Sequence, residues 1–206
     1  VDSISMEESL SLIENSIEQR RSLHHVVVNA AKIVSAQKDH VIKDSIVNCD
    51  LINADGQAVV WASIFLNKRL PERVAGIDLM EKLVKRSAQN GYKIFLLGAK
   101  EEIVKRVVSK YTLLFGDQII AGYRDGYFQE SEEEAVALQI AESKADILFV
   151  AMSSPRKEIF LDHYKELIQT PFIMGVGGSF DVISGIVKRA PLWAQTYGFE
   201  WFYRLL

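Results

Sequence analysis

The sequence has a single cysteine, Cys49, among its 206 residues. One cysteine excludes an intrachain disulfide and suits a reducing cytosol, where it most simply fills a small apolar position in a strand. No apolar run approaches the roughly 18 residues that a transmembrane helix needs, and we expect no signal peptide. These absences predict a soluble or membrane-peripheral protein of the cytoplasm.

Several kinds of site are also missing. The sequence contains neither a Walker-type G-x-x-x-x-G-K nor a G-x-S-x-G elbow. Its four histidines show no paired metal spacing, and the D-x-D motif of metal-dependent sugar transferases is absent. Lys and Arg number 24 against 27 Asp and Glu, which leaves no basic surplus for a nucleic-acid surface. We therefore expect no metal site, no cofactor and no nucleic-acid partner.

Short β-type runs alternate with helical patterns along the whole chain, which predicts one α/β domain over residues 1–206. Several strand candidates are continuous apolar runs, as expected where both faces of a strand are buried. The predicted fold is Rossmann-like, with a mostly parallel sheet of about six strands and helices on both faces. Strands are expected at His24–Asn29, Asp50–Asn53, Lys93–Leu97, Gln118–Ala121, Ile147–Ala151 and Phe172–Val176. Helices are expected at Met6–Arg20, Ala30–Gln37, Gln57–Leu66, Leu79–Gln89, Glu101–Lys110, Glu132–Ser143 and Pro155–Ile168.

Two helix ends carry local signals, and both ends of the chain look cropped. Gly91 suits a C-terminal cap, and Ser154 suits an N-cap followed by Pro155 in the first helical position. The final segment, Leu192–Leu206, has a helical pattern rich in aromatic residues, with Arg204 near its end. Such a helix either packs on the core or lies at a lipid headgroup interface, and its aromatic side chains also make self-association plausible.

Asp55 stands at the end of the apolar run Cys49–Ala54, where a buried parallel strand would present it at the ligand-binding edge of the sheet. Two roles are open: N-cap of the helix that starts near Gly56, or general base toward an attacking hydroxyl. Arg73 likewise either pairs with an acid such as Asp78 or clamps a diphosphate. Together they suggest group transfer from a phosphate-activated donor.

Three glycines follow the last predicted strand, in the run from Gly175 to Asp181. Gly177 and Gly178 allow close backbone approach to a ligand, and the helix start behind them offers N–H groups to phosphate. Phe180 occupies the third glycine position of G-x-G-x-x-G, so a nicotinamide-dependent oxidoreductase is disfavoured. The run instead suits a loop near a nucleotide, with Asp181 as a hydrogen-bond acceptor.

Two further turns carry candidate ligand residues. Lys157 falls in the first turn of a predicted helix, where a cation opposes the helix dipole, and this mildly favours a ligand role over a solvated helix start. Tyr127 belongs to an aromatic turn that is either core or a platform for a ring.

Five motifs in order resemble the WecG/TagA/CpsF glycosyltransferase family over nearly the whole chain. They are Asn53–Gly56, Glu72–Asp78, Gly175–Asp181, Lys188–Pro191 and Glu200–Leu206. The resemblance implies an inverting, metal-independent transfer from a UDP-sugar to a polyprenyl-diphosphate-linked sugar, at the cytoplasmic face of a bacterial inner membrane. Such enzymes build teichoic-acid linkage units, enterobacterial common antigen or capsular polysaccharide.

The resemblance also implies residue roles. Asp55 matches the proposed base and Arg73 the support of the diphosphate, while Asn29, Tyr127 and Asp181 match the nucleotide-sugar pocket. A C-terminal appendage of the family docks on the membrane and adds arginines to the site. The present chain is expected to stop where that appendage begins, and so to be poorly active.

Two positions depart from the family pattern near the expected donor site. Val27 replaces a threonine, and Lys157 replaces the glutamine of a Ser-Pro-Lys-Gln-Glu pattern. Our hypothesis is that Lys157 pairs with the carboxylate of a uronic-acid donor or with the diphosphate. The alternative is an inactive nucleotide-sugar binding or scaffold protein.

Overall fold

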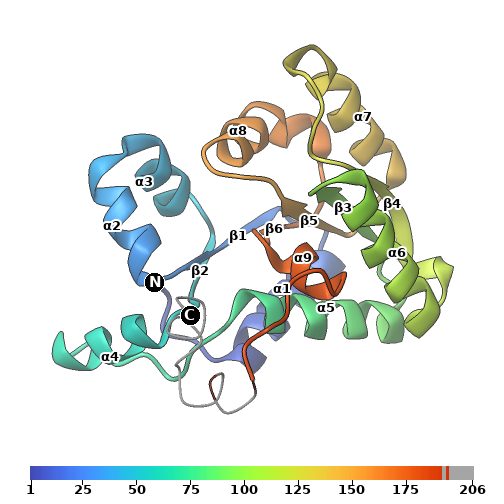
Figure 1. Cartoon of the computed structure of the whole chain (residues 1–206). Coiled ribbons are helices and arrows are strands. Elements are labelled where there is room, and N and C mark those ends of the chain that lie inside the picture. The colour runs from blue at the N-terminus through green and yellow to red at the C-terminus, as the bar shows by residue number, and fades with distance from the viewer. Residues whose placement is uncertain (192–193, 195–206) are drawn as a thin grey trace.

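A computed structural model of the chain describes residues 1–191 and 194. Its six strands form one parallel sheet in the order β2-β1-β6-β5-β3-β4, with helices on both faces (Figure 1). The predicted α/β architecture is therefore confirmed. The strands are β1 (Leu23–Val28), β2 (Leu51–Ala54), β3 (Ile94–Gly98), β4 (Ile120–Arg124), β5 (Ile147–Ala151) and β6 (Phe172–Gly175).

The helices divide between the two faces of the sheet. One face is covered by α1 (Met6–Glu18), α5 (Gly76–Asn90), α6 (Glu101–Phe115) and α9 (Ser179–Ile183). The other face carries α2 (Ala30–Lys38), α3 (His40–Val47), α7 (Glu133–Ser143) and α8 (Arg156–Ile168). The remaining helix, α4 (Gln57–Phe65), projects beside β2, and η1 (Asp117–Ile119) and η2 (Glu130–Glu132) are single 3-10 turns.

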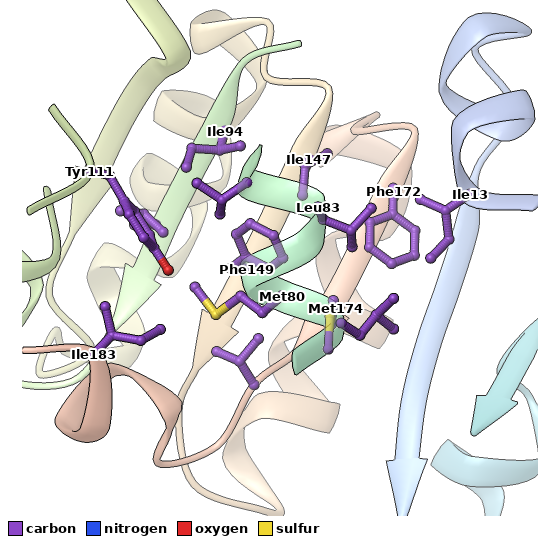
Figure 2. Close-up of a cluster of buried hydrophobic side chains, with 14 of the residues drawn as sticks. Ile13, Met80, Leu83, Ile94, Tyr111, Ile147, Phe149, Phe172, Met174 and Ile183 are labelled. Atoms are coloured by element: carbon purple, nitrogen blue, oxygen red, sulfur yellow. The ribbon is translucent and has the colours of Figure 1, made fainter. Parts of the chain in front are cut away.

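The central strands are buried on both sides, which explains their continuous apolar sequences. In β3, Ile94 and Leu96 join the cluster under α5 and α6, while Phe95 and Leu97 face α7 and α8. Figure 2 shows the first cluster, in which Phe149 lies beside Met80 of α5. This alternation follows from the two-residue period of a strand. It anchors the sheet whose carboxyl edge bears the candidate site.

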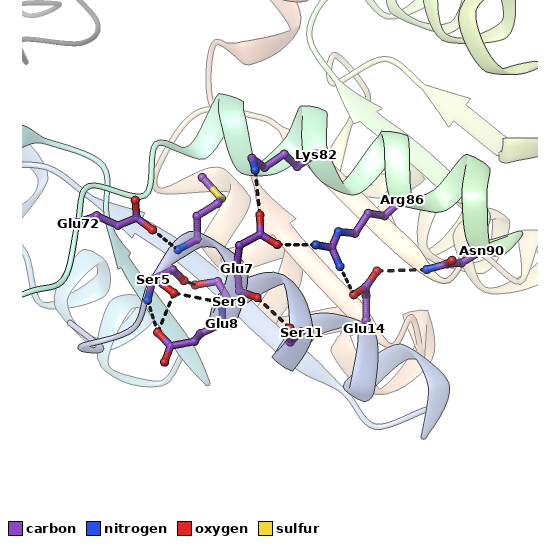
Figure 3. Close-up of polar contacts among 11 residues, drawn as sticks. Ser5, Glu7, Glu8, Ser9, Ser11, Glu14, Glu72, Lys82, Arg86 and Asn90 are labelled. Carbon is purple, nitrogen blue, oxygen red and sulfur yellow. Dashed lines mark hydrogen bonds and ion pairs between the residues drawn. The ribbon is translucent and has the colours of Figure 1, made fainter.

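Hydrogen bonds and ion pairs connect α5 to α1 (Figure 3). Arg86 donates to Glu7 and Glu14, both at 2.6 Å, and Lys82 donates to Glu7 at 3.0 Å. Glu72, just before α5, accepts the backbone N–H of Met6 at 2.7 Å. These contacts hold the helix whose first residue lies at the candidate site.

Some sequence predictions need correction. No helix was predicted at α3, which Asp39 caps by accepting from the N–H groups of Val41 and Ile42. The helix start expected behind the glycine loop is present as the short α9, which begins at Ser179. Ser154 is not an N-cap and Pro155 is not the first helical residue. Instead, α8 begins at Arg156, because the Ser154 hydroxyl donates to the Glu158 carboxylate at 2.8 Å instead of accepting a backbone N–H.

Other expectations have mixed outcomes. Gly91 caps α5 in the left-handed conformation, as predicted. Cys49 lies in the connection between α3 and β2 and not in a strand, with its thiol donating to the Ser45 carbonyl. The predicted helix over Leu192–Leu206 lies, apart from Ala194, outside the described residues. Within the part of the chain that is described, no helix combines the length and apolarity that crossing a bilayer requires.

Candidate active site

The candidate site residues gather at the carboxyl edge of the sheet. All strand pairs are parallel, so all six strands end at this edge, where open α/β sheets bind ligands. The predicted residues follow five different strands: Asn29 follows β1, Asp55 follows β2, Tyr127 follows β4, Lys157 follows β5, and Gly177, Gly178 and Asp181 follow β6.

Asp55 is half-buried directly after β2. Its Oδ1 accepts the backbone N–H of Gly76 at 3.2 Å, and Gly76 is the first residue of α5. The predicted cap on α4 is wrong, since Gly56 occupies that N-cap without any side-chain bond. Asp55 instead supports the start of α5, where the helix dipole stabilises a negative charge. The bond to Gly76 fixes the direction of the carboxylate, as a general base requires.

Asn29 lies beside Asp55, because their strands are neighbours. Val28 pairs with Ala54, and the Asp55 N–H donates to the Val28 carbonyl at 2.9 Å. Asn29 is exposed and caps α2 through a 2.9 Å bond from the Lys32 N–H to its Oδ1. The structure thus brings together two of the predicted site residues.

Val27, the position that departs from the family threonine, packs against the start of α5. A Cβ built on Gly76 would lie 3.3 Å from a Val27 methyl group, so only glycine fits there without a shift. Gly76 also donates to Asp55. Val27 therefore presents methyl groups, and no hydroxyl, to the helix start on which Asp55 rests.

Arg73 lies in the connection that returns from α4 to this edge. The next residue, Val74, donates its N–H to the Ala54 carbonyl at 2.9 Å, which places the Arg73 backbone at the end of β2. The arginine is half-buried. Asp78, the acid considered above for Arg73, binds Arg189, and the neighbouring Glu72 accepts the Met6 N–H. Arg73 and Asp55 thus belong to the same corner of the sheet.

Arg189 is a residue of this corner that sequence reasoning did not single out. Its guanidinium donates to both oxygens of Asp78, at 2.6 and 2.9 Å, from a segment 111 positions further along the chain. Asp78 lies in the first turn of α5. The pair joins two of the motifs quoted above, Glu72–Asp78 and Lys188–Pro191. The presence of both residues in family motifs was the only sign in the sequence that they belong to the site.

The glycine loop is open on its outer side. Gly177 is exposed in the left-handed conformation, with φ +50, and a Cβ there would meet nothing within 4 Å. A Cβ on Gly178 would lie 3.7 Å from an Asp181 carboxylate oxygen. Asp181 lies in the first turn of α9, directly after the glycine loop. These three predicted residues are together, next to β6.

Lys157 belongs to a buried charge cluster above the end of β6. Its Nζ lies 2.8 Å from Glu158 Oε1. The same oxygen accepts a hydrogen bond from the Ser154 hydroxyl and lies 3.9 Å from Lys32 Nζ. A Cβ on Gly175 would lie 3.0 Å from the Lys157 ammonium, so any side chain there would require the end of the lysine to shift. Two ammonium groups thus share one carboxylate. The cluster carries one positive charge in excess.

Burial shifts the titration of this cluster. Desolvation and the neighbouring Lys157 lower the pKa of Lys32, although Glu158 opposes this. Burial alone would raise the pKa of Glu158, but Lys157 holds it below its usual range. Glu158 Oε2 is buried and has no hydrogen-bond partner among the described residues. Sequence reasoning missed Lys32 and Glu158, because their meeting depends on two helices that follow different strands.

Tyr127 lies apart from the Asp55 corner. Its side chain is 71% exposed, in a turn whose Gly126 donates to the Ala99 carbonyl beyond β3. Arg156 of α8 donates to the carbonyls of Gly126 and Phe128 on either side of it. The tyrosine is therefore not core, and it stands on the side of the carboxyl edge formed by β5, β3 and β4.

A cavity of about 410 Å³ lies between α3 and α8. Among the predicted site residues that the structure describes, Lys157 lines this cavity and Asp55 does not. Burial raises the pKa of Cys49, also in its wall, to about 11, so its thiol stays protonated. Across residues 1–191 and 194, no three His, Cys, Asp or Glu side chains are grouped to hold a metal ion.

Comparison with known proteins places this geometry in context. The model of the glycosyl transferase WecG/TagA/CpsF family matches residues 1–206. A curated relative from Bacillus subtilis (strain 168) is 40% identical over 195 residues, which are 95% of this chain and 75% of the relative. That relative is named N-acetylglucosaminyldiphosphoundecaprenol N-acetyl-beta-D-mannosaminyltransferase. The resemblance predicted from the five motifs is confirmed.

Proposed function

The chain belongs to the WecG/TagA/CpsF family of glycosyl transferases, and from this premise we propose that it transfers a sugar from a UDP-sugar to a polyprenyl-diphosphate-linked sugar. The name of the Bacillus relative, which pairs an N-acetylmannosaminyl group with a lipid-diphosphate acceptor, supports this substrate class. The product would enter cell-surface polysaccharide or teichoic acid at the cytoplasmic face of the membrane. The transferred sugar would be of the N-acetylmannosamine type, a uronic acid or a hexose.

The observation that carries the proposal is the placement of Asp55. Its carboxylate is held by the Gly76 N–H at the carboxyl edge, beside Asn29 and the Arg73 segment. In the proposed reaction Asp55 takes the proton of the acceptor hydroxyl. The hydroxyl oxygen then forms a bond to the anomeric carbon while the bond from that carbon to the UDP oxygen breaks. Attack from the face opposite UDP inverts the anomeric centre.

Charge that grows on the departing diphosphate needs compensation. We assign this to Arg73, to the N–H groups of the glycine loop and to the helix starts at the same edge. A guanidinium fork matches two phosphate oxygens, which is why Arg73 suits this role. Independence from a metal ion is part of the proposal.

The Lys32–Glu158–Lys157 cluster supports an acidic donor. Because two ammonium groups share one carboxylate, the cluster favours an additional anion. It lies at the end of β6, next to the glycine loop. A sugar carboxylate or the diphosphate of the donor would supply that charge.

One observation favours the alternative of an inactive nucleotide-sugar binding protein. Val27 places methyl groups at the α5 start where the family pattern has a hydroxyl. A binding protein of this kind would retain UDP affinity without transferring sugar.

A UDP-release assay tests the proposal. Neutral and acidic UDP-sugars are offered with a lipid-diphosphate-linked sugar as acceptor, and UDP affinity is measured by calorimetry in parallel. UDP release that depends on the acceptor supports the transferase. UDP binding without release for any donor, both in this chain and in one extended at its C-terminus, supports the alternative, and the absence of UDP binding contradicts both.

A further inference from the structure

Helix α4 is apolar on two opposite sides, but the described chain covers one of them. Val59, Val60 and Ser63 are buried against β2 and Leu70. The other side, with the helical spacing i, i+3, i+4, i+7, consists of Ala58, Trp61, Ala62 and Phe65, and all four are exposed. A helix that is apolar all round normally has a second partner on its outer side.

The exposure is largest at the end of the helix. Phe65 is 91% exposed and Leu66 72%, with Ile64 at 54% and Trp61 at 44%. Trp61, Ile64 and Phe65 have the spacing i, i+3 and i+4 along α4, and Leu66 follows as its C-cap. The helix projects beside the sheet (Figure 1). An exposed cluster of large apolar side chains marks an interaction surface.

The charged residues within the segment 56–71 are of one sign. No Asp or Glu occurs between residues 56 and 71, and Lys68 and Arg69 lie just after Leu66. Both are exposed, and neither forms an ion pair with a residue in the described part of the chain. The segment thus carries two positive charges, although the whole chain has a net charge of −3. We call Trp61, Ile64, Phe65, Leu66, Lys68 and Arg69 the α4 surface.

This composition matches an anionic lipid interface. Trp, Phe and Leu enter the boundary between headgroups and acyl chains, while adjacent Lys and Arg meet the phosphates. A second copy of the chain is a poorer match, because a two-fold contact through this surface would bring like charges together. We propose that the α4 surface docks on the headgroup layer of a membrane containing anionic lipid.

The position of α4 next to the candidate site relates membrane docking to the proposed reaction. Gly56, the N-cap of α4, directly follows Asp55, so the helix extends outward from the carboxyl edge. Docking through its far end would hold that edge close to the lipid surface. The inference does not depend on the identity of the donor, and it concerns an element separate from the C-terminal region.

Vesicle co-sedimentation tests the proposal. The chain is mixed with vesicles of phosphatidylglycerol and phosphatidylcholine, or with phosphatidylcholine alone. The variant Phe65→Ser/Leu66→Ser removes two exposed side chains, so the core is untouched. The matched control is Leu113→Ser/Leu114→Ser, at the end of α6, where the two leucines are 86% and 58% exposed. Thermal unfolding verifies that each variant folds as the parent does.

We expect the parent chain to bind the anionic vesicles, and Phe65→Ser/Leu66→Ser to bind about tenfold more weakly, since two large apolar contacts are lost. Lys68→Ser/Arg69→Ser should weaken binding to anionic vesicles alone, and the α6 control should bind as the parent does. The proposal is overturned if the parent does not bind, or if the α4 and α6 variants bind alike. It is also overturned if sedimentation velocity finds a dimer that Phe65→Ser/Leu66→Ser dissociates, which would assign the surface to a second copy.

Discussion

Arg189 donates two hydrogen bonds, of 2.6 and 2.9 Å, to the carboxylate of Asp78, which lies 111 residues earlier in the sequence. The arginine side chain is 19% exposed, so solvent screens the pair only in part. The pair links the segment that follows α9 to the first turn of α5. Asp78 lies two residues after Gly76, whose N–H donates to Asp55. This pair therefore contributes to the shape of the Asp55 corner.

Replacing Arg189 by lysine is expected to destabilise the fold by about 1–2 kcal/mol, because an ammonium cannot form both bonds of the guanidinium fork. Urea unfolding measures the change. The matched control is Arg20→Lys, whose pair with Asp146 is 59% exposed on the arginine side and should change stability by less than about 0.5 kcal/mol. Equal effects of the two substitutions would mean that the Arg189 pair is no more than a surface contact.

Asp55→Asn tests the general base. Asparagine keeps an oxygen that can accept the Gly76 N–H but cannot take a proton from the acceptor, so turnover should fall by about 10²–10⁴-fold. UDP affinity should stay within about threefold, because the proposed role concerns the acceptor. The measurements are UDP release and calorimetry.

Asp117→Asn is the control for that substitution. Asp117 is exposed just before β4, at the amino edge of the sheet and therefore away from the proposed site. Its replacement should leave both turnover and UDP affinity as they are. Turnover near normal in Asp55→Asn would remove Asp55 from the reaction.

The sheet was predictable because its strands are buried on both faces. Ile147–Ala151 is a continuous apolar run, and its predicted bounds match the structure. Helix α3 was missed because it has only eight residues and follows α2 after the single residue Asp39, so no Gly or Pro marks the boundary between the two helices. The start of α9 behind the glycine loop was predicted, but its five residues are too few for a sequence pattern to give its end.

The site was predictable in position more than in contact. A polar residue at a strand end had to lie at the carboxyl edge, and Asp55 does. Its bond to Gly76, by contrast, depends on a connection that returns from α4, which no local pattern encodes. The approach of Lys32 to Glu158 similarly depends on how two helices pack across β6.

The lysine cluster makes a prediction about donor choice. If Lys157 and Lys32 hold a sugar carboxylate, Lys157→Gln and Lys32→Gln should each lower the preference for acidic over neutral UDP-sugars by about tenfold. Initial rates of UDP release with paired donors measure this ratio. Lys93→Gln is the control: Lys93 is exposed directly before β3, at the amino edge of the sheet, and its replacement should retain the parent ratio.

The same experiment separates two positions for the anion. An equal loss of affinity for UDP and for both kinds of donor would place the diphosphate, and not a sugar carboxylate, at the lysines. Donor ratios and UDP affinities that match the parent in both variants would contradict any anion contact at this cluster.

His25 predicts a loss of stability in mild acid. The ring is buried, its Nε2 donates to Asn53 Oδ1 at 2.9 Å, and its Nδ1 has no partner among the described residues. Burial lowers the pKa of His25 from 6.5 to about 4, although the bond to Asn53 opposes this. The folded state therefore holds a neutral ring, whereas the unfolded chain binds a proton below its ordinary pKa.

The direction of the effect follows from linkage. A folded-state pKa below the unfolded value means that the contribution is complete above about pH 6.5 and disappears as the pH falls toward 4. The shift corresponds to about 3 kcal/mol. Urea unfolding at several pH values should show a shallower decline for His25→Gln than for the parent over this range. His40→Gln, on the exposed start of α3, should follow the parent, and an equal decline in all three proteins would show that other groups account for the acid sensitivity.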